Sequence, residues 1–391
     1  MGRMGKKIDT DIIHIGSNPK LHYGSINDPI YKNSTIIFEN YKSFIESKSM
    51  KLEVPYYGRI NTYTTKRFEV LIAQLYKCNS AVITSSGLSA ITTTLVSFLK
   101  KEDEILLTEN CYEPVYNFTK IVLKKFGINS KYFSSNNISK LSSLISNKTK
   151  IIYLESPGSL NFEVENITNI VNLAKSKKIL TVMDNTWSTF IGCNPLKLGI
   201  DIVIESATKY MSGHSDTFLG IIATKSKKYK KVIKETSVRL GDFVSSESCF
   251  EAYKGLKTLK VRMDKHQFNS EKIFKYLKSQ KVVKDIIYLP DESNKYHKLW
   301  KKFHKINNGL ITFSIEKCDK IEKFVDSLKE FKIGFSWGGY ESLILPLKSL
   351  KPAKKLSIND HYWFRIHVGL ENYEDLIEDL DNAIKKYAKK K

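Results

Sequence analysis

The sequence has little arginine, little cysteine and no long apolar run. Only six of its 63 basic residues are arginine, the side chain that reads base edges with a bidentate fork. The formal net charge of +22 therefore comes from lysines, which are scattered through every segment. This pattern favours a solvated basic surface and no nucleic-acid partner. A basic nucleic-acid-binding protein without catalysis is the remote alternative.

The five cysteines are an odd number, and no two of them have the spacing of metal ligands. A disulfide framework and a metal site are therefore not expected, and we expect a reducing, cytoplasmic setting. Every apolar run falls short of the roughly 20 residues that span a bilayer, so we expect no membrane association. The acidic stretch EDLIEDLD followed by the basic run KKYAKKK suits one terminal helix.

The pattern of apolar residues and turn signals changes twice along the sequence. These changes predict an N-terminal arm and two domains. Residues 1–55 have weak periodicity and predict an extended N-terminal arm that packs on something else, such as a second subunit. In residues 56–250, strand patterns alternate with helix patterns, so we expect a large α/β domain with a mostly parallel sheet. Residues 251–391 predict a smaller α+β C-terminal domain with a long helix and the strand-like segments GLITFSI, FKIGFSW and WFRIHVG.

The common short motifs of several enzyme classes are absent. The sequence contains no G-x-G-x-x-G, Walker or H-E-x-x-H pattern, and GLSAI and GHSDT both fail the last position of G-x-S-x-G. A Rossmann or P-loop nucleotide site, a zinc protease centre and a hydrolase nucleophile elbow are therefore not indicated.

Three segments carry residue types that suit one ligand. SSGLSA, at residues 85–90, predicts a strand end, a glycine turn and a helix start, where free N–H groups bind anions. Four β-formers bring Asp184 to the end of a buried strand, where a carboxylate needs a cationic partner. Lys209 follows the strand DIVIESAT, as expected for a perturbed amine that forms Schiff bases. Each segment alone also fits an ordinary turn or surface residue.

Taken together, the three segments predict a cofactor. A cofactor with a phosphate, a ring nitrogen and an aldehyde needs an anion cradle, an acid and a lysine, and pyridoxal 5'-phosphate (PLP) is such a cofactor. SSGLSA would supply the cradle, Asp184 the acid and Lys209 the amine. Ser206 and Thr208 flank the lysine with hydroxyls that can bind phosphate.

Seven segments, in order over roughly residues 20 to 385, also carry a family resemblance: YGRINTYT, SSGLSA, ENCYEP, ESPGS, DNTWSTF, ESATKYMSGHSD and SWGGYESL. Together they resemble the successive signatures of the Cys/Met-metabolism PLP enzymes. The tryptophan of DNTW and the SWGGYES segment favour the β-lyase branch over the γ-synthase and γ-lyase relatives.

The resemblance implies a fold and an activity. The fold is the PLP-dependent transferase fold, known as fold type I. The activity is a carbon–sulfur lyase that cleaves L-cystathionine by β-elimination to homocysteine, pyruvate and ammonia, in methionine biosynthesis by transsulfuration. The same chemistry also allows alanine racemisation, γ-elimination or γ-replacement.

The resemblance further implies which residues hold the cofactor. Lys209 would bind it covalently and move protons between the substrate α-carbon, the cofactor and the leaving sulfur. Asp184 would pair with the ring nitrogen. The phosphate would be held by backbone N–H groups and hydroxyls, from Gly87, Leu88, Ser206 and Thr208.

Two residues just after the expected arm are expected to act across a subunit interface. Tyr57 and Arg59 would reach the cofactor phosphate of a neighbouring subunit, which requires at least a homodimer and suggests a tetramer of two dimers. Tyr112 would stack on the cofactor ring and contact the substrate, and Tyr57 or Tyr112 would help to deprotonate the incoming amine.

The substrate, a small amino acid, is expected to bind through the C-terminal domain. Arg365 would clamp its α-carboxylate, for which a guanidinium fork is the natural partner. Ser336 and Trp337 would line the same end of the pocket. Phe335 stands where β-lyases of the family often have tyrosine, so the missing hydroxyl could alter the preference for the distal end of the substrate.

Overall fold

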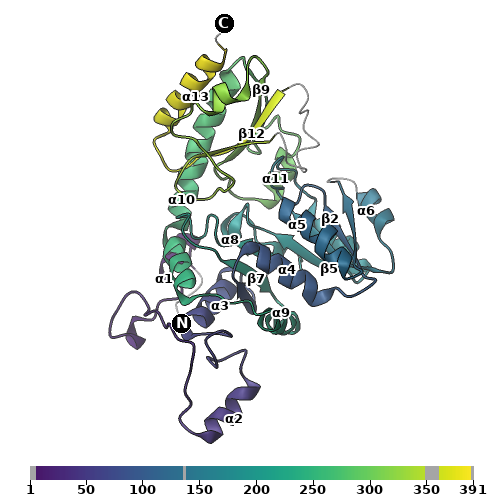
Figure 1. The fold of residues 1–391 in the computed structure, drawn as a ribbon, viewed down its shortest axis with the longest axis vertical. Helices are drawn as coiled ribbons and strands as arrows, with labels where there is room; N and C mark the ends of the chain where they lie inside the picture. Colours follow the sequence, from purple (N-terminus) through teal and green to yellow (C-terminus); the bar gives the residue numbers. More distant parts are fainter. Residues whose placement is uncertain (1–5, 135–137, 348–360, 389–391) are drawn as a thin grey trace.

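The computed structural model describes residues 6–134, 138–347 and 361–388, and these residues form two β-sheets surrounded by helices (Figure 1). Residues 1–5 of the expected arm and 389–391 of the expected basic tail lie outside the described residues. Within the described part of the chain, none of the helices is both long enough and apolar enough to cross a membrane.

The larger sheet has the strand order β1-β7-β6-β5-β4-β2-β3. Its strands are β1 (Ser80–Thr84), β2 (Glu104–Thr108), β3 (Asn129–Phe133), β4 (Thr149–Glu155), β5 (Leu180–Asp184), β6 (Ile202–Ser206) and β7 (Gly220–Thr224). Strands β2 to β6 run parallel to one another, whereas β7 is antiparallel to both β6 and β1. The predicted mostly parallel sheet is confirmed.

Helices cover both faces of this sheet because successive strand residues point to opposite sides. In β1, Val82 packs in a core with α4 and α9, whereas Ala81 and Ile83 pack in a core with α3, α7 and α10. These helices are α3 (Tyr63–Leu75), α4 (Gly87–Phe98), α7 (Ile167–Ser176), α9 (Lys227–Arg239) and α10 (Ser246–Ser279). The parallel strands of a layered α/β fold are usually buried on both faces in this way.

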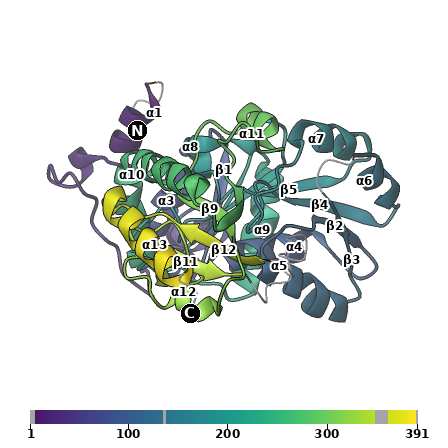
Figure 2. The same cartoon turned by 90° about the horizontal axis from the view of Figure 1, so that it is seen from above.

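The remaining helices are short, apart from the last. They are α1 (Ile8–His14), η1 (Pro19–Leu21), α2 (Tyr41–Ser49), α5 (Glu113–Asn117), the π-helix η2 (Phe118–Leu123), α6 (Ile138–Leu144), α8 (Thr189–Gly192), η3 (Pro195–Lys197), α11 (His297–Phe303), α12 (Ile321–Val325) and α13 (Tyr373–Ala388). Seen from above, the β3 edge of the larger sheet lies away from α1 (Figure 2).

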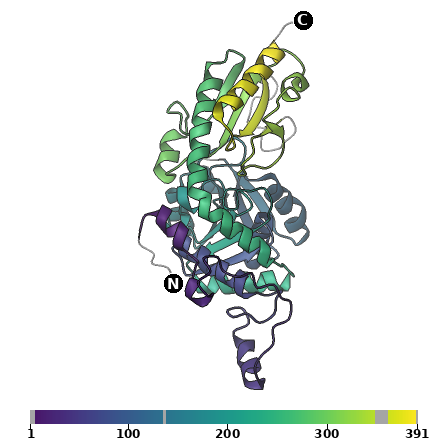
Figure 3. The ribbon, with the colours of Figure 1, turned by 90° about the vertical axis from the view of Figure 1, so that its left-hand side faces the viewer.

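The smaller sheet has the order β10-β11-β12-β9-β8 and packs against α10, α12 and α13. Its strands are β8 (Val283–Ile287), β9 (Leu310–Glu316), β10 (Lys332–Ile333), β11 (Leu343–Pro346) and β12 (His361–His367). Helix α10 connects the two sheets and runs through residues 250 and 251, where the sequence predicts a domain boundary (Figure 3). The strand expected over FKIGFSW is wrong beyond Ile333, because the Phe335 carbonyl accepts a side-chain hydrogen bond instead of a ladder bond.

The segment before α3 leaves the body of the molecule, with α2 at the end remote from the smaller sheet (Figure 1). Its start is fastened to α10, since Lys257 Nζ donates to the carbonyls of Ile12 and Ile15 at 3.1 and 2.8 Å. Farther along, large apolar side chains stay exposed, among them Tyr23, Ile37 and Tyr41. The single chain therefore leaves several apolar side chains of its arm uncovered.

Candidate active site

The sheet topology brings several polar strand ends to one edge. Glu155 and Asp184 end the neighbouring parallel strands β4 and β5 and are register partners. Ser206 ends β6, and Thr84 ends β1; both pair with Gly220, from opposite sides of β7. The carboxyl ends of all four strands therefore meet at the same edge, which is where open α/β sheets bind their ligands.

The start of α4, where the sequence predicts an anion cradle, lies at this edge. Ser86 caps the helix by accepting a hydrogen bond from the Ser89 N–H at 3.1 Å. The N–H groups of Gly87 and Leu88 fall in the first turn, which has no intrahelical acceptors and favours anions. A Cβ on Gly87 would lie 2.6 Å from the Ser206 Oγ, so glycine is what lets that hydroxyl approach the helix start.

Thr208, the other hydroxyl expected at the phosphate, makes a structural contact. Its Oγ1 accepts from the Leu219 N–H at 3.0 Å and donates to the Leu219 carbonyl at 3.4 Å. These bonds tie the turn that carries Lys209 to the residue before β7. The structure therefore places Thr208 beside the cradle segment with its hydroxyl already engaged.

Asp184 is a buried carboxylate at the same edge. Its Oδ1 accepts the Thr186 N–H at 2.9 Å, and the Thr186 Oγ1 accepts the Ser206 N–H at 2.8 Å. One threonine thus links the acid to the cradle strand. Burial raises the pKa of the Asp184 carboxyl, which is the expected behaviour of an acid without a cationic partner. Sequence reasoning did not single out Thr186, although its place two residues after Asp184 fits an Asx turn.

Lys209 lies between the two sheets. Its Nζ donates to the Ser336 Oγ at 2.8 Å and lies 5.5 Å from the centre of the Trp337 ring. Burial, and after it the Arg365 guanidinium, lowers the pKa of Lys209 to about 8. An amine with this pKa is partly neutral near pH 7 and can act as a nucleophile and a base.

The Ser336–Gly338 turn packs directly on the lysine. Gly338 has a φ of +90°, and a Cβ there would lie 2.8 Å from the Tyr210 backbone nitrogen. Only glycine accommodates this conformation and this approach at low cost. The close backbone approach of Gly338 therefore helps to bring Ser336 and Trp337 against Lys209.

Arg365 in β12 completes the same end of the site. It is 4% exposed, and its guanidinium donates to the carbonyls of Ser159 at 3.2 Å and Phe335 at 2.8 Å. Burial lowers the pKa of Arg365 to about 10, so the group stays charged near pH 7. Phe335 contributes only its carbonyl here, because its side chain is 78% exposed.

Tyr112 lies just before α5, with 45% of its surface exposed. Its backbone N–H donates to Glu155 Oε2 at 2.6 Å, which anchors the tyrosine to the strand next to Asp184. Burial, and after it the Asp184 carboxylate, raises the pKa of Glu155 well above its usual range. Sequence reasoning missed Glu155, although, like Asp184, it is a carboxylate at the end of a run of β-forming residues.

Tyr57 and Arg59 are not joined to the other expected site residues within one chain. Arg59 Nη1 donates to the Val238 carbonyl of α9 at 3.1 Å. The Tyr57 carbonyl accepts from the N–H groups of Ile60 and Asn61, and its side chain is 42% exposed. Both residues are exposed, although Arg59 contacts α9 of its own chain.

The residues that do meet fit the cofactor expected from the sequence. The close approach of Gly87 and Ser206 leaves a small cradle for an anionic group at a helix start. The buried Asp184 suits a cationic ring nitrogen, and the Lys209 amine suits an aldehyde. The set therefore satisfies the three demands of PLP at one edge of the sheet.

Comparisons with known proteins agree with this geometry. The family of Cys/Met metabolism PLP-dependent enzymes matches residues 9–385. The L-alanine/L-glutamate racemase of Wolbachia pipientis wMel is 32% identical, with 97% of each chain covered. The cystathionine beta-lyase of Haemophilus influenzae is 30% identical, with 97% of this chain and 98% of the relative covered.

A solved structure has the same fold. The cystathionine gamma-lyase of Lactobacillus plantarum, crystallised with L-serine, superposes with a TM-score of 0.90. It is 28% identical and covers 98% of this chain and 99% of its own. The predicted PLP-dependent transferase fold is confirmed.

Proposed function

The chain belongs to the Cys/Met metabolism PLP-dependent enzymes and uses pyridoxal phosphate, and within that family we propose that it is a cystathionine β-lyase. It would split L-cystathionine into homocysteine, pyruvate and ammonia. The observation that carries this proposal is the Lys209 Nζ, held 2.8 Å from the Ser336 Oγ in the segment that favours the β-lyase branch. The β-lyase of H. influenzae supports it. Membership of the family sets aside the nucleic-acid-binding alternative.

Bound PLP draws electrons from the α-carbon of an amino acid, which makes the α-proton acidic and allows a β-substituent to leave. The protein would supply the proton movements. The Lys209 amine would take the α-proton and would return a proton to the departing sulfur, and a pKa of about 8 suits both roles. Asp184 would keep the ring nitrogen protonated, and Tyr57 or Tyr112 would help to deprotonate the incoming amine.

The remaining residues would hold the reactants in place. Gly87, Leu88 and Ser206 would bind the cofactor phosphate, with Thr208 supporting the turn. Tyr112 would stack on the ring, because Glu155 fixes its backbone at the same edge. Arg365 and Ser336 would orient the α-carboxylate, and Trp337 would close that side of the pocket.

Replacing Arg365 with lysine should raise KM for cystathionine about 10- to 100-fold, with a smaller effect on kcat. Lysine keeps the charge but loses the planar fork, and hydrogen bonds to charged groups contribute about 1.5–3 kcal/mol. Steady-state kinetics would measure the split between KM and kcat. A KM equal to that of the unaltered enzyme would contradict the assigned carboxylate site.

The reaction preference is tested by comparing substrates. We expect kcat/KM for L-cystathionine, followed through pyruvate and thiol release, to exceed that for the racemisation of L-alanine. A higher kcat/KM for alanine would overturn the β-lyase assignment while leaving the family assignment intact.

Amino-acid racemisation is the second candidate activity. The Wolbachia relative, named an L-alanine/L-glutamate racemase, is 32% identical over nearly the whole chain. Both reactions begin with removal of the α-proton, so the same lysine and acid would serve either of them. The γ-lyase and γ-synthase reactions would also share that first step.

We also propose that the active protein is at least a homodimer, and a tetramer of two dimers. Tyr57 and Arg59 would then complete the phosphate site of a neighbouring subunit, which agrees with the exposure of both residues. The exposed apolar residues of the arm would be covered in such an assembly.

A further inference from the structure

One face of α9 is fastened to the arm. Lys230, Lys234 and Val238 recur at every fourth residue, so they share a side of the helix. Lys230 Nζ pairs with Glu53 Oε1 at 2.5 Å, and the Val238 carbonyl accepts Arg59 Nη1 at 3.1 Å. The segment from Glu53, in the arm, to Arg59, just after it, therefore contacts α9 at both of its ends.

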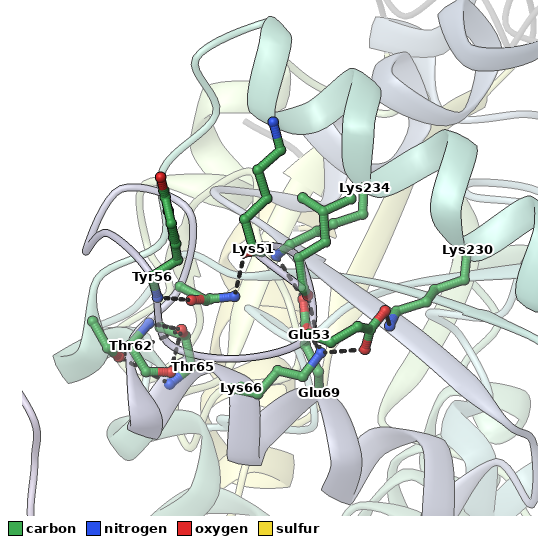
Figure 4. Close-up of polar contacts among 11 residues, drawn as sticks. Lys51, Glu53, Tyr56, Thr62, Thr65, Lys66, Glu69, Lys230 and Lys234 are labelled. Atoms are coloured by element: carbon green, nitrogen blue, oxygen red, sulfur yellow. Dashed lines mark hydrogen bonds and ion pairs between the residues drawn. The ribbon is translucent and has the colours of Figure 1, made fainter. Parts of the chain in front are cut away.

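Glu53 also contacts a lysine of α3, as Figure 4 shows. Lys66 Nζ lies 3.0 Å from Glu53 Oε2 and donates to the Leu52 carbonyl at 3.2 Å. The same Nζ lies 3.4 Å from Glu69 Oε2, and Glu69 Oε1 pairs with Lys234 at 2.7 Å. Charges of opposite sign alternate along this network, and Glu53 is its contribution from the arm.

The network divides into a buried part and an exposed end. The side chains of Glu69 and Lys234 are 3% and 6% exposed, so removing either would leave a buried charge without its partner. The Glu53 side chain is 58% exposed. Its removal leaves Glu69 paired with Lys66 and Lys234, so the link between α3 and α9 persists while the ion pairs that join Glu53 to both helices are lost.

Hydrogen bonds of a buried asparagine shape the segment that carries Tyr57 and Arg59. Asn61 is 2% exposed; its Oδ1 accepts the Tyr56 N–H at 3.2 Å, and its Nδ2 donates to the Lys51 carbonyl at 3.4 Å. The Asn61 side chain thus closes the segment into a loop. Gly58 donates to the Ser34 carbonyl at 2.7 Å, which fixes the tip of the loop.

The network connects this loop to the body that carries the cofactor cradle. Helix α9 packs against α4, whose first residues form that cradle. Just after α9, Asp242 Oδ1 accepts the Ser85 N–H at 3.2 Å, at the turn into the cradle. In a symmetric dimer, each loop has a fixed relation to the other subunit. Holding the loop against α9 of its own chain therefore also sets its distance from the cradle of the partner.

We propose that Glu53 is a positioning residue for cofactor phosphate binding in trans. Its ion pairs with Lys66 and Lys230 hold the Tyr57–Arg59 loop against α9, in the orientation needed at the neighbouring subunit. The inference rests on the proposed dimer, in which Arg59 reaches the phosphate of the partner. It extends that proposal by naming the residue that sets the orientation of the arginine.

The test measures the dissociation constant of PLP for the full-length protein, by titration of the visible absorbance of bound cofactor. Glu53→Gln should raise this constant about fivefold, because ion pairs at partly exposed sites are modest. Glu53→Gln and Lys230→Gln break the same ion pair, so their effects should not add. The double variant should therefore bind PLP as tightly as whichever single variant binds it more weakly. The melting temperature and the oligomeric state should stay unchanged.

Glu271→Gln is the matched control. Glu271 pairs with Lys275 on α10 at 2.5 Å, and its side chain is 51% exposed. This variant removes the same charge from a carboxylate of similar exposure, in an ion pair away from the arm. It should leave the PLP dissociation constant at the value of the unaltered protein.

Mixed dimers test whether the action is in trans. In a dimer of one E53Q chain and one Lys209→Ala chain, the only intact lysine lies in the E53Q subunit, and the arm that serves it carries Glu53. That site should regain the PLP affinity of the unaltered protein. Affinity that stays weak in this mixed dimer would show an effect within one chain and would overturn the proposal.

Arg59→Ala distinguishes the proposed phosphate site in trans from the proposed positioning role of Glu53. If R59A weakens PLP binding while E53Q matches Glu271→Gln, the positioning role of Glu53 is wrong and the trans phosphate site stands. If R59A itself leaves PLP binding unchanged, the proposed role of the arm at the cofactor fails, and the role of Glu53 fails with it.

Discussion

Replacing Lys209 with alanine should abolish the visible absorbance of covalently held cofactor and lower kcat for cystathionine cleavage by about ten-thousandfold or more. This side chain is assigned both the covalent attachment and the transfer of protons, so no other group of the site replaces it. The fold should stay intact, because within the described residues the Lys209 Nζ donates a hydrogen bond to the Ser336 Oγ alone. Absorbance spectra and pyruvate release would measure the two losses.

Lys257→Ala is the informative control for this experiment. Burial also lowers the pKa of Lys257 to about 8, but its Nζ binds the carbonyls that end α1. A lowered pKa is therefore not sufficient for the assigned chemistry. The control should retain the cofactor absorbance. Cleavage that persists in the Lys209→Ala variant would refute the assignment of the catalytic lysine.

Changing Asp184 to asparagine should lower kcat roughly a hundred- to a thousandfold, which is the loss typical of removing one pre-arranged charge from an active site. The amide cannot keep the ring nitrogen protonated. Its oxygen can still accept the Thr186 N–H, so the turn and its link to Ser206 survive. The stability of the variant should therefore stay close to that of the unaltered protein in a thermal melt.

Asp201→Asn supplies the comparison for this variant. Asp201 accepts the Thr181 N–H at 2.9 Å, near the amino ends of β5 and β6 and hence at the opposite edge of the sheet. This change should leave kcat nearly unaltered. Equal kcat values for the Asp184 and Asp201 variants would mean that Asp184 is not the partner of the ring nitrogen.

Local sequence patterns predicted the secondary structure correctly at those parts of the site that consist of a short run of residues. The turn SSGLSA is a strand end followed by a capped helix, and the β-forming run before Asp184 is a buried strand. Both readings need only neighbours in the chain, because hydrogen bonds and alternation act over a few residues. The segment FKIGFSW shows the limit: an apolar run alone could not reveal that the Phe335 carbonyl binds Arg365.

The sequence by itself determined the residue types of the site, the alternating α/β order and the family. The tertiary structure decided which of these residues meet. Ser336 reaches Lys209 across 127 positions, and Glu53 reaches Lys230 across 177. Such pairs depend on how strands and helices pack, which a local pattern cannot encode because it records neither distance nor direction through space. For the same reason, Tyr57 and Arg59 could be named from the sequence, whereas the charges that hold their loop became visible only in the folded chain.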